Sequence, residues 1–194
     1  MSDRFVEVLA EEAIFNRWII KWRNVRFRRS TFNGVGDKTS ERLVLEWGDS
    51  VGILIHDTTR NEVVLVEQLR IATKATGGWI LEIPAGKVDA GEEPRQTAIR
   101  EAQEETGAEI ANIEHISSFY LSPGISTERL HLYYCPLDDG VILNQYTGVA
   151  DEDEDIQVHR MPLGEALDQI AQGQIVDAKS ILALFWLKLR MDRR

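Results

Sequence analysis

The sequence predicts an α+β layered fold with a small β-rich segment in front of it. Three observations support this prediction: several runs alternate apolar and polar residues, three stretches have helical periodicity, and 194 residues with 43% hydrophobic content can bury a sizeable core. Strands mixed with a few helices are typical of layered α+β domains. We expect a β-rich extension at residues 1–48 and a main domain at residues 49–194.

The extension is expected to form antiparallel strands. Apolar side chains alternate with basic ones between residues 18 and 28, which is the period of a strand with one buried face. Residues 33–37, Asn-Gly-Val-Gly-Asp, are a turn signal, and a further strand pattern covers residues 41–47.

The main domain is expected to contain six strands and three helices, the last of them near residue 190. The strands are expected at residues 51–56, 62–68, 79–83, 113–119, 130–135 and 156–161, and the helices at residues 94–106, 163–172 and 178–190. Pro94 fits a first helical turn, and Gly107 and Gly173 fit the positions just after a helix, where a left-handed backbone is common.

Composition excludes several classes of protein. No stretch reaches the eighteen uncharged apolar residues of a membrane span, and the N-terminal residues lack the apolar region of a signal peptide. The single cysteine, Cys135, excludes an intramolecular disulfide framework and a thiolate zinc cluster. We therefore expect a soluble cytoplasmic protein with no membrane partner.

The net charge of −10 is concentrated in two segments. Residues 81–120 carry −6 and residues 138–155 carry −7, so the rest of the chain carries +3. This balance argues against nucleic acid as a partner, because +3 is small for following a phosphate backbone. A site for a metal cation needs acidic side chains close together, and these two segments can supply them.

Three carboxylates share one face of the helix expected at residues 94–106. Glu101 and Glu105 are four residues apart, and Glu104 is three residues from Glu101. Like charges at this spacing destabilise an isolated helix, and hard oxygen ligands suit Mg²⁺ or Mn²⁺ better than zinc or copper. The pattern therefore favours a divalent-cation site. A solvated surface helix is the alternative.

The segment from Gly86 to Ala108 resembles the Nudix box. That pattern is Gly, five residues, Glu, seven residues, Arg-Glu, an aliphatic residue, any residue, Glu-Glu, any residue, Gly and an aliphatic residue. All seven fixed positions match, namely Gly86, Glu92, Arg100, Glu101, Glu104, Glu105 and Gly107. At ordinary residue frequencies such a match arises by chance in one window with a probability on the order of 10⁻⁹. Ala102 and Ala108 are smaller than the aliphatic residues often seen at their positions.

The resemblance to the Nudix family implies an α/β/α sandwich of mixed sheets, and hydrolysis of a nucleoside diphosphate linked to another moiety. It implies Mg²⁺, or Mn²⁺, bound by the Ala85 carbonyl, Glu101 and Glu105, with Glu104 as a further ligand or a water-mediated partner. Glu101 and Glu105 would be catalytic. Such ions would neutralise an anionic pyrophosphate and activate water. By the same resemblance Arg100 orients the glutamates and Glu92 supports the loop.

Segments outside the box resemble the ADP-ribose pyrophosphatase subgroup. Pro123 and Gly124 follow the box in a Ser-Pro-Gly turn that would be ordinary by itself, but beside a complete box it resembles the proline hallmark of that subgroup. Residues 66–70, 79–86 and 148–156 resemble the same bacterial ADP-ribose and ADP-sugar hydrolases. The resemblance assigns substrate contacts to Arg70, Pro123, Gly124 and Glu128. A surface position at a strand end is the alternative for Arg70.

The acidic run Asp151–Asp155 has two interpretations. Most charge runs of this length are hydrated loops. In the subgroup this loop supplies the carboxylate that deprotonates the attacking water, and the match places Glu152 at the base position and Glu154 at a further metal-ligand position. A carboxylate base is chemically reasonable because a bound metal acidifies water. The neighbouring acids leave an error of one position open.

Aromatic and basic residues of the extension are candidates for stacking on a purine base: Trp18, Trp22, Phe27, Arg26 and Arg28. The alternative is that they form strand faces of a dimer interface. In the subgroup the N-terminal strands commonly build a homodimer whose partner lines the base pocket. We therefore expect the extension to be a dimerisation element, and five tryptophans agree with an aromatic-rich interface.

Together these expectations describe a homodimeric, Mg²⁺-dependent Nudix pyrophosphohydrolase. It would cleave ADP-ribose or a related nucleoside diphosphate sugar into AMP and a sugar phosphate. A GDP-mannose pyrophosphatase of the same fold is the nearest alternative, and residues 79–86 favour ADP-ribose. Hydrolysis of RNA 5′ ends is a further option. A non-catalytic nucleotide-binding module should have lost carboxylates of the box, and none is missing.

Overall fold

The computed structural model describes residues 4–17, 20–137, 143–148 and 155–193. The chain divides into two compact units. The first unit consists of residues 1–48 and 120–129, and the second of residues 49–119 and 130–194. The loop at 120–129 thus groups with residues 1–48.

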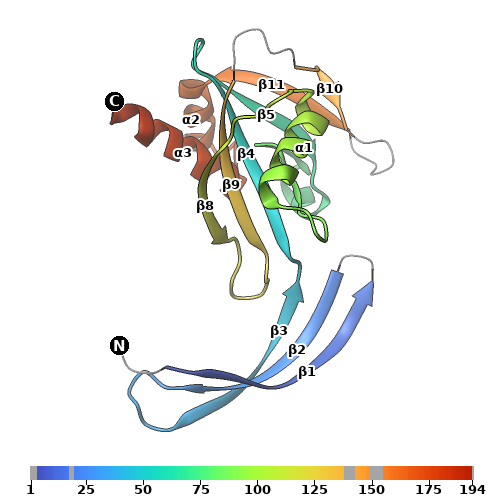
Figure 1. The fold of residues 1–194 in the computed structure, drawn as a ribbon, viewed down its shortest axis with the longest axis vertical. Helices are drawn as coiled ribbons and strands as arrows, with labels where there is room; N and C mark the ends of the chain where they lie inside the picture. The colour runs from blue at the N-terminus through green and yellow to red at the C-terminus, as the bar shows by residue number, and fades with distance from the viewer. Residues whose placement is uncertain (1–3, 18–19, 138–142, 149–154, 194) are drawn as a thin grey trace. The chain divides into compact units, whose positions relative to one another are not determined.

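The first unit contains a three-stranded antiparallel sheet, seen in Figure 1. Its strands are β1 (Val6–Arg17), β2 (Ile20–Ser30) and β3 (Asp37–Glu46), in that order. The antiparallel character expected of the extension is confirmed, and β2 and β3 match the predicted strand patterns. The alternation that predicts a strand is less regular in β1, whose pairing with β2 shifts register at two places.

The second unit contains an eight-stranded sheet. Its strands are β4 (Asp49–Asp57), β5 (Glu62–Leu69), β6 (Trp79–Glu82), β7 (Ala85–Lys87), β8 (Glu114–Tyr120), β9 (Arg129–Leu137), β10 (Tyr146–Thr147) and β11 (Ile156–Pro162). The order is β10-β11-β5-β4-β9-β8, with β6 also paired to β5 and β7 to β4. The short strands β6 and β7 therefore lie next to the two central strands.

Three α-helices and one 3-10 helix complete the described part of the second unit. They are η1 (Ile71–Thr76), α1 (Pro94–Thr106), α2 (Leu163–Ala171) and α3 (Ala178–Asp192). Helix α1 has the bounds that its periodicity predicts, and it ends at Gly107, whose φ of 74° is the left-handed value that favours glycine. Helix α3 begins after Asp177, whose carboxylate accepts the Ser180 N–H at 2.9 Å. The prediction of these helices is confirmed.

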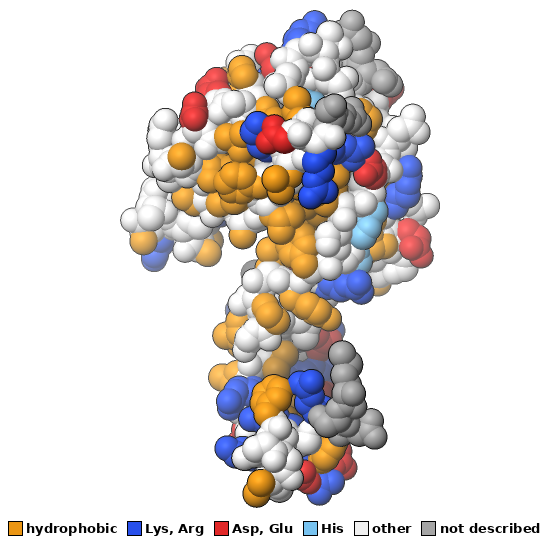
Figure 2. All heavy atoms as spheres, turned by 90° about the vertical axis from the view of Figure 1, so that its left-hand side faces the viewer, with side chains coloured by type: hydrophobic (Ala, Val, Ile, Leu, Met, Phe, Trp, Pro, Cys, Tyr) orange, Lys and Arg blue, Asp and Glu red, His pale blue; other side chains and the backbone are white. Residues whose placement is uncertain are grey.

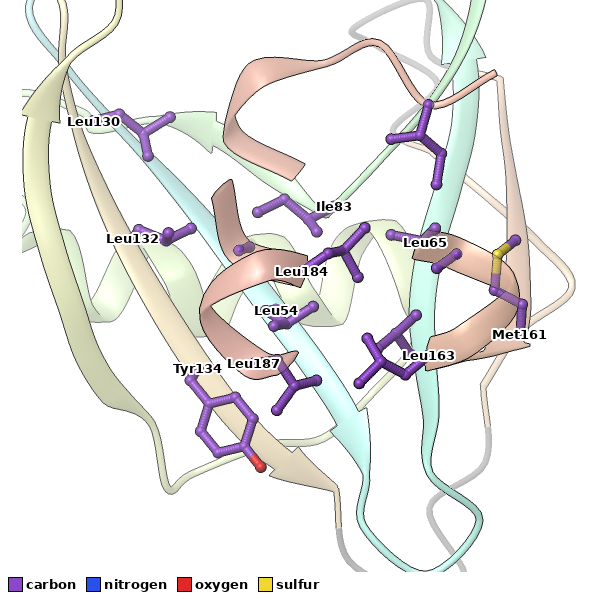
Figure 3. Packing of buried hydrophobic residues seen from close by; sticks show 14 residues of the cluster. Leu54, Leu65, Ile83, Leu130, Leu132, Tyr134, Met161, Leu163, Leu184 and Leu187 are labelled. Carbon is purple, nitrogen blue, oxygen red and sulfur yellow. The ribbon is translucent and has the colours of Figure 1, made fainter. Parts of the chain in front are cut away.

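The core consists of two hydrophobic clusters, one on each side of the sheet. Alternate residues of β5 point to opposite faces, so Leu65 belongs to one cluster and Val64 to the other. The cluster of Leu65 includes Leu184 of α3 and is shown in Figure 3. The cluster of Val64 includes Ala98 and Ala102 of α1. Their small side chains allow α1 to pack closely against the strands that carry the candidate site.

Helices therefore cover both faces of the sheet, with α1 on one face and α2 and α3 on the other, as Figure 1 shows. This is the α/β/α layering expected from the sequence. Hydrophobic side chains gather on the face of the second unit that carries α2 and α3 (Figure 2). Among the described residues, no helix combines the length and the apolar character needed to cross a bilayer.

Candidate active site

Helix α1 presents two of its carboxylates to the short strand β7. Glu105 is 1% exposed, and its Oε2 accepts the backbone N–H of Ala85 at 3.0 Å. A Cβ atom added to Gly86 would lie 1.9 Å from Oε1 of Glu101. The carboxylate of Glu101 thus fills the space that the missing side chain of Gly86 leaves. Three of the predicted site residues, Ala85, Glu101 and Glu105, are brought together here.

Arg100 joins the other acids of the box. Its Nη1 lies 2.6 Å from Glu104 Oε2 and 2.9 Å from Glu101 Oε1, and its Nη2 lies 3.3 Å from Glu92 Oε2. The hydrogen bond from Arg100 holds the pKa of Glu92 below its usual range. Burial lowers the pKa of Arg100, but its bond with Glu92 and the charges of Glu101 and Glu104 outweigh that effect and raise it. The guanidinium therefore contacts three carboxylates of the box, as the orienting role predicted from the resemblance requires.

The donor set at this place suits a hard divalent ion. Two carboxylates lie against β7, and carboxylate and carbonyl oxygens are the ligands that Mg²⁺ and Mn²⁺ take in proteins. Among the described residues, no three acidic, histidine or cysteine side chains gather closely enough to surround an ion by themselves. Glu101 and Glu105 would have to act with the backbone of Ala85 and with further acids. The residues fit a metal site on the chemistry of their oxygens.

The C-terminal end of α1 is tied to residues 143–148. The Asn144 N–H donates to the Thr106 carbonyl at 2.9 Å, and the Thr147 hydroxyl donates to the Glu105 carbonyl at 2.5 Å. A Cβ atom at Gly107 would lie 2.5 Å from the Asn144 side chain. This segment is therefore fixed on the helix that carries the carboxylates. The chain runs from it into the acidic run.

Several predicted residues lie outside the described part of the chain. They are the candidate base Glu152, the candidate ligand Glu154 and the candidate base-stacking residue Trp18. Their roles stay predictions.

Arg70 follows β5 and contacts a buried acid. Its Nε and Nη2 lie 2.8 Å and 2.7 Å from Oε1 of Glu82, which is 1% exposed. The Arg70 side chain itself is 40% exposed. The arginine is therefore anchored on its inner side and open on its outer side.

The buried partner of this ion pair is one that the sequence pattern does not indicate. The other oxygen of Glu82, Oε2, pairs with Nζ of Lys179, and that Nζ lies 3.1 Å from Asp177. Glu82 lies in an apolar strand pattern and Lys179 in an apolar helix pattern, so the sequence does not indicate that either residue belongs to a functional site. Gln68, also buried, has an amide nitrogen without a hydrogen-bond partner, and among the described residues no other buried side-chain nitrogen or oxygen lacks one.

Pro123, Gly124 and Glu128 belong to the first unit, in the loop between β8 and β9. The loop pairs with the end of β3, where the Leu45 N–H donates to the Ile125 carbonyl at 2.7 Å. The Glu128 N–H donates to the Ser126 hydroxyl at 3.0 Å. A cavity of about 330 Å³ lies beside this loop and is lined by Val44, Tyr120 and residues 123–127. Two of the predicted substrate contacts, Pro123 and Gly124, line it.

The candidate base-stacking residues do not form one surface. Successive residues of a strand point to opposite faces, so Phe27 lies on one face of β2 while Trp22, Arg26 and Arg28 lie on the other. Arg28 is also paired with Glu7, at 2.6 Å. The four described candidates therefore cannot act as a single stacking platform within one chain.

Comparison with known proteins gives relatives and a fold neighbour. Residues 46–184 match the NUDIX domain family. The ADP-ribose pyrophosphatase of Escherichia coli (strain K12) is 37% identical over 95% of this chain and 88% of its own length. The GDP-mannose pyrophosphatase of Cronobacter sakazakii is 35% identical over 95% of this chain and 96% of its own length.

A crystal structure described as an ADP compounds hydrolase has the same fold. Its TM-score is 0.74, with 19% sequence identity, over 96% of this chain and 94% of that one. The fold expected from the sequence is thereby confirmed. With its matched domain, its relatives above 30% identity and its complete box from β7 to the end of α1, this chain belongs to the Nudix family.

Proposed function

We propose that the chain hydrolyses the pyrophosphate bond of ADP-ribose or a related nucleoside diphosphate sugar, releasing AMP and a sugar phosphate. The observation that carries the proposal is the packing of α1 on β7, which holds the carboxylates of Glu101 and Glu105 together beside the Ala85 backbone. The names of the relatives at 37% and 35% identity support this class of substrate. A GDP-mannose substrate is the second candidate, since one of these relatives acts on it.

In the proposed site Glu101, Glu104 and Glu105, with the carbonyl of Ala85 and with Glu154, hold Mg²⁺, which Mn²⁺ can replace. The bound ion supplies charge neutralisation of the pyrophosphate and an acidified water. Arg70 donates hydrogen bonds to the phosphate oxygens. Its planar guanidinium matches phosphate geometry better than an ammonium group does.

Glu152 takes the proton from the attacking water in this proposal. The fixed position of Thr147 on the Glu105 carbonyl supports the assignment. Glu152 is the fifth residue after Thr147, and a chain of that length spans at most about 17 Å. This chain length allows an acid of the run Asp151–Asp155 to reach the end of α1, and the resemblance selects Glu152 among them.

The first test is a panel of ADP-ribose, GDP-mannose, ADP-glucose, NADH and diadenosine polyphosphates, each assayed with Mg²⁺. We expect ADP-ribose to give the highest kcat/KM and AMP as a product. A chelator such as EDTA should abolish the activity, and added Mg²⁺ should restore it. Hydrolysis of none of these compounds with either Mg²⁺ or Mn²⁺ would overturn the proposed function.

A homodimer is the second part of the proposal. All twelve residues of β1 are exposed in the single chain, and they include Val6 at 70%, Ile14 at 56% and Val8 at 54%. A strand with this much apolar surface needs a covering partner, and a second copy of the chain would supply one. Figure 2 shows hydrophobic side chains among the charged ones of this sheet.

Light scattering after size-exclusion chromatography tests the dimer. The wild type should have twice the chain mass of 22.1 kDa at micromolar concentration. Val8→Lys should shift the mass to that of one chain, because a buried unpaired charge is costly. Glu12→Lys should leave the mass unchanged, because Glu12 pairs with Asn24 and so lies on the other face of the sheet from Val8, which pairs with Phe27. A wild type that is monomeric at this concentration contradicts the dimer.

The cytoplasmic location of the protein stays a prediction, which cell fractionation can test.

A further inference from the structure

We propose that the buried pair of Lys179 and Glu82 positions Arg70 for the diphosphate of the substrate. This inference rests on the proposed function, because it takes Arg70 as a phosphate contact. Lys179 is a positioning residue in it: the side chain acts through Glu82 and Arg70 and touches no substrate.

The geometry of the pair supports this role. Oε1 of Glu82 accepts from Nε and Nη2 of Arg70, and Oε2 pairs with Nζ of Lys179. Glu82 is 1% exposed and Lys179 is 7% exposed. Both oxygens of a buried carboxylate are therefore occupied, each by a different cation. Removal of one partner from such a group leaves an uncompensated buried charge.

Because each oxygen of Glu82 binds a different cation, Arg70 keeps N–H donors for a ligand. A guanidinium has five N–H groups in a planar fork, and Glu82 takes one from Nε and one from Nη2. In the part of the chain that the structure describes, no other hydrogen bond or ion pair engages the side chain of Arg70, which is 40% exposed. The remaining N–H groups belong mainly to Nη1. They can donate to a diphosphate while Glu82 holds the plane of the guanidinium.

Helix α3 holds Lys179 in place through its first turn. Asp177, whose carboxylate caps the helix, lies 3.1 Å from the Lys179 Nζ. The hydroxyl of Ser180 accepts the backbone N–H of Ile83, the residue after Glu82, at 2.8 Å. The start of α3 is thus bonded to the end of β6 in two ways: Lys179 pairs with the Glu82 carboxylate, and the Ser180 hydroxyl accepts the Ile83 backbone N–H. This makes the position of Glu82, and with it that of Arg70, depend on α3.

Loss of Lys179 should therefore act on Arg70. Without the ammonium, Oε2 of Glu82 would be a buried acceptor lacking a cation, and Arg70 is the nearest cation that remains. Arg70 would turn to bind both oxygens as a fork, which is the strongest geometry for an arginine and a carboxylate. Its outer N–H groups would then be used inside the protein. Substrate binding should weaken while the carboxylates of α1 stay in place.

The experiment compares Lys179→Met with Lys188→Met on the same helix. Lys188 is half-exposed and pairs only with Asp192 among the described residues, so the same change there removes an ion pair without affecting Arg70. Steady-state kinetics with ADP-ribose and Mg²⁺ should give K179M a KM raised about tenfold and a kcat within about threefold of the wild type. K188M should have the kcat and KM of the wild type, and Lys179→Arg should have a KM close to the wild-type value.

A double-mutant cycle separates positioning from a merely structural role. Arg70→Met should raise KM at least as much as K179M does, and K179M added to R70M should raise it no further. An unchanged KM in K179M, or an equal rise with and without Arg70, would overturn the inference. If K179M does not fold, Glu82→Gln takes its place in the cycle with the same expected outcomes.

Binding of inorganic pyrophosphate, measured by calorimetry, keeps this test independent of turnover. The wild type should bind it about tenfold more tightly than K179M or E82Q does. Failure of the wild type to hydrolyse any substrate would reject the proposed function, whereas equal pyrophosphate binding by the wild type and K179M would reject the positioning role.

Discussion

Glu105→Gln should lower kcat by about a thousandfold and leave KM within a few-fold of the wild type. Glu105 is buried on α1, and one of its oxygens is held by the Ala85 N–H. The change keeps the shape of the side chain and removes its charge, so the site loses an anionic ligand for the divalent ion. Charge stabilisation by such an ion contributes several kcal/mol to the transition state, and each 1.36 kcal/mol is tenfold in rate.

The control for this change is Glu109→Gln, an exposed position three residues beyond α1. It makes the same chemical change outside the site and should leave kcat unchanged. Thermal unfolding of both variants should match the wild type, which would separate lost chemistry from lost structure. Near-normal turnover of E105Q in saturating Mg²⁺ would remove Glu105 from the proposed metal ligands.

Gly86→Ala should lower kcat by about a hundredfold. The added Cβ would lie 1.9 Å from Oε1 and 2.0 Å from Cδ of Glu101, far inside van der Waals contact. Either the carboxylate turns away or α1 moves off β7. A displacement of about 1 Å at a catalytic site can cost about a hundredfold in rate. The kinetic constants with ADP-ribose and the melting temperature should be measured together.

Gly164→Ala is the matched glycine control, because a Cβ there meets nothing within 4 Å. It should leave kcat unchanged. A double variant with Glu101→Asp gives the decisive comparison, since the shorter side chain makes room for the new methyl group. The loss in the double variant should be smaller than the product of the two single losses. Multiplicative losses would mean that Gly86 and Glu101 act independently.

The sequence allowed the local features of the fold and site to be predicted. Helix α1 begins at Pro94 and ends before Gly107 because a proline and a glycine mark its two ends. The spacing of Glu101 and Glu105 placed both carboxylates on one face. These features depend on residues within one or two helical turns, so a local pattern is enough to predict them.

Features that depend on distant residues were not predicted. The ion pair of Lys179 with Glu82 joins positions 97 residues apart, and no local pattern connects them. The loop at 120–129 joins the first unit because its backbone pairs with Leu45 of β3. The strands β7 and β10 have three and two residues, too few for any alternation to be visible. Each of these features is decided by tertiary contacts.

The ion pairs of Arg100 bear on whether α1 can fold without a bound cation. Glu92, Glu101 and Glu104 all lie within 3.3 Å of its guanidinium, so a cation built into the helix already offsets part of their repulsion. Folding of α1 should then not require a bound cation to offset these charges. We therefore expect the chain to stay folded when divalent ions are removed, so that their return would restore activity without a cycle of unfolding and refolding.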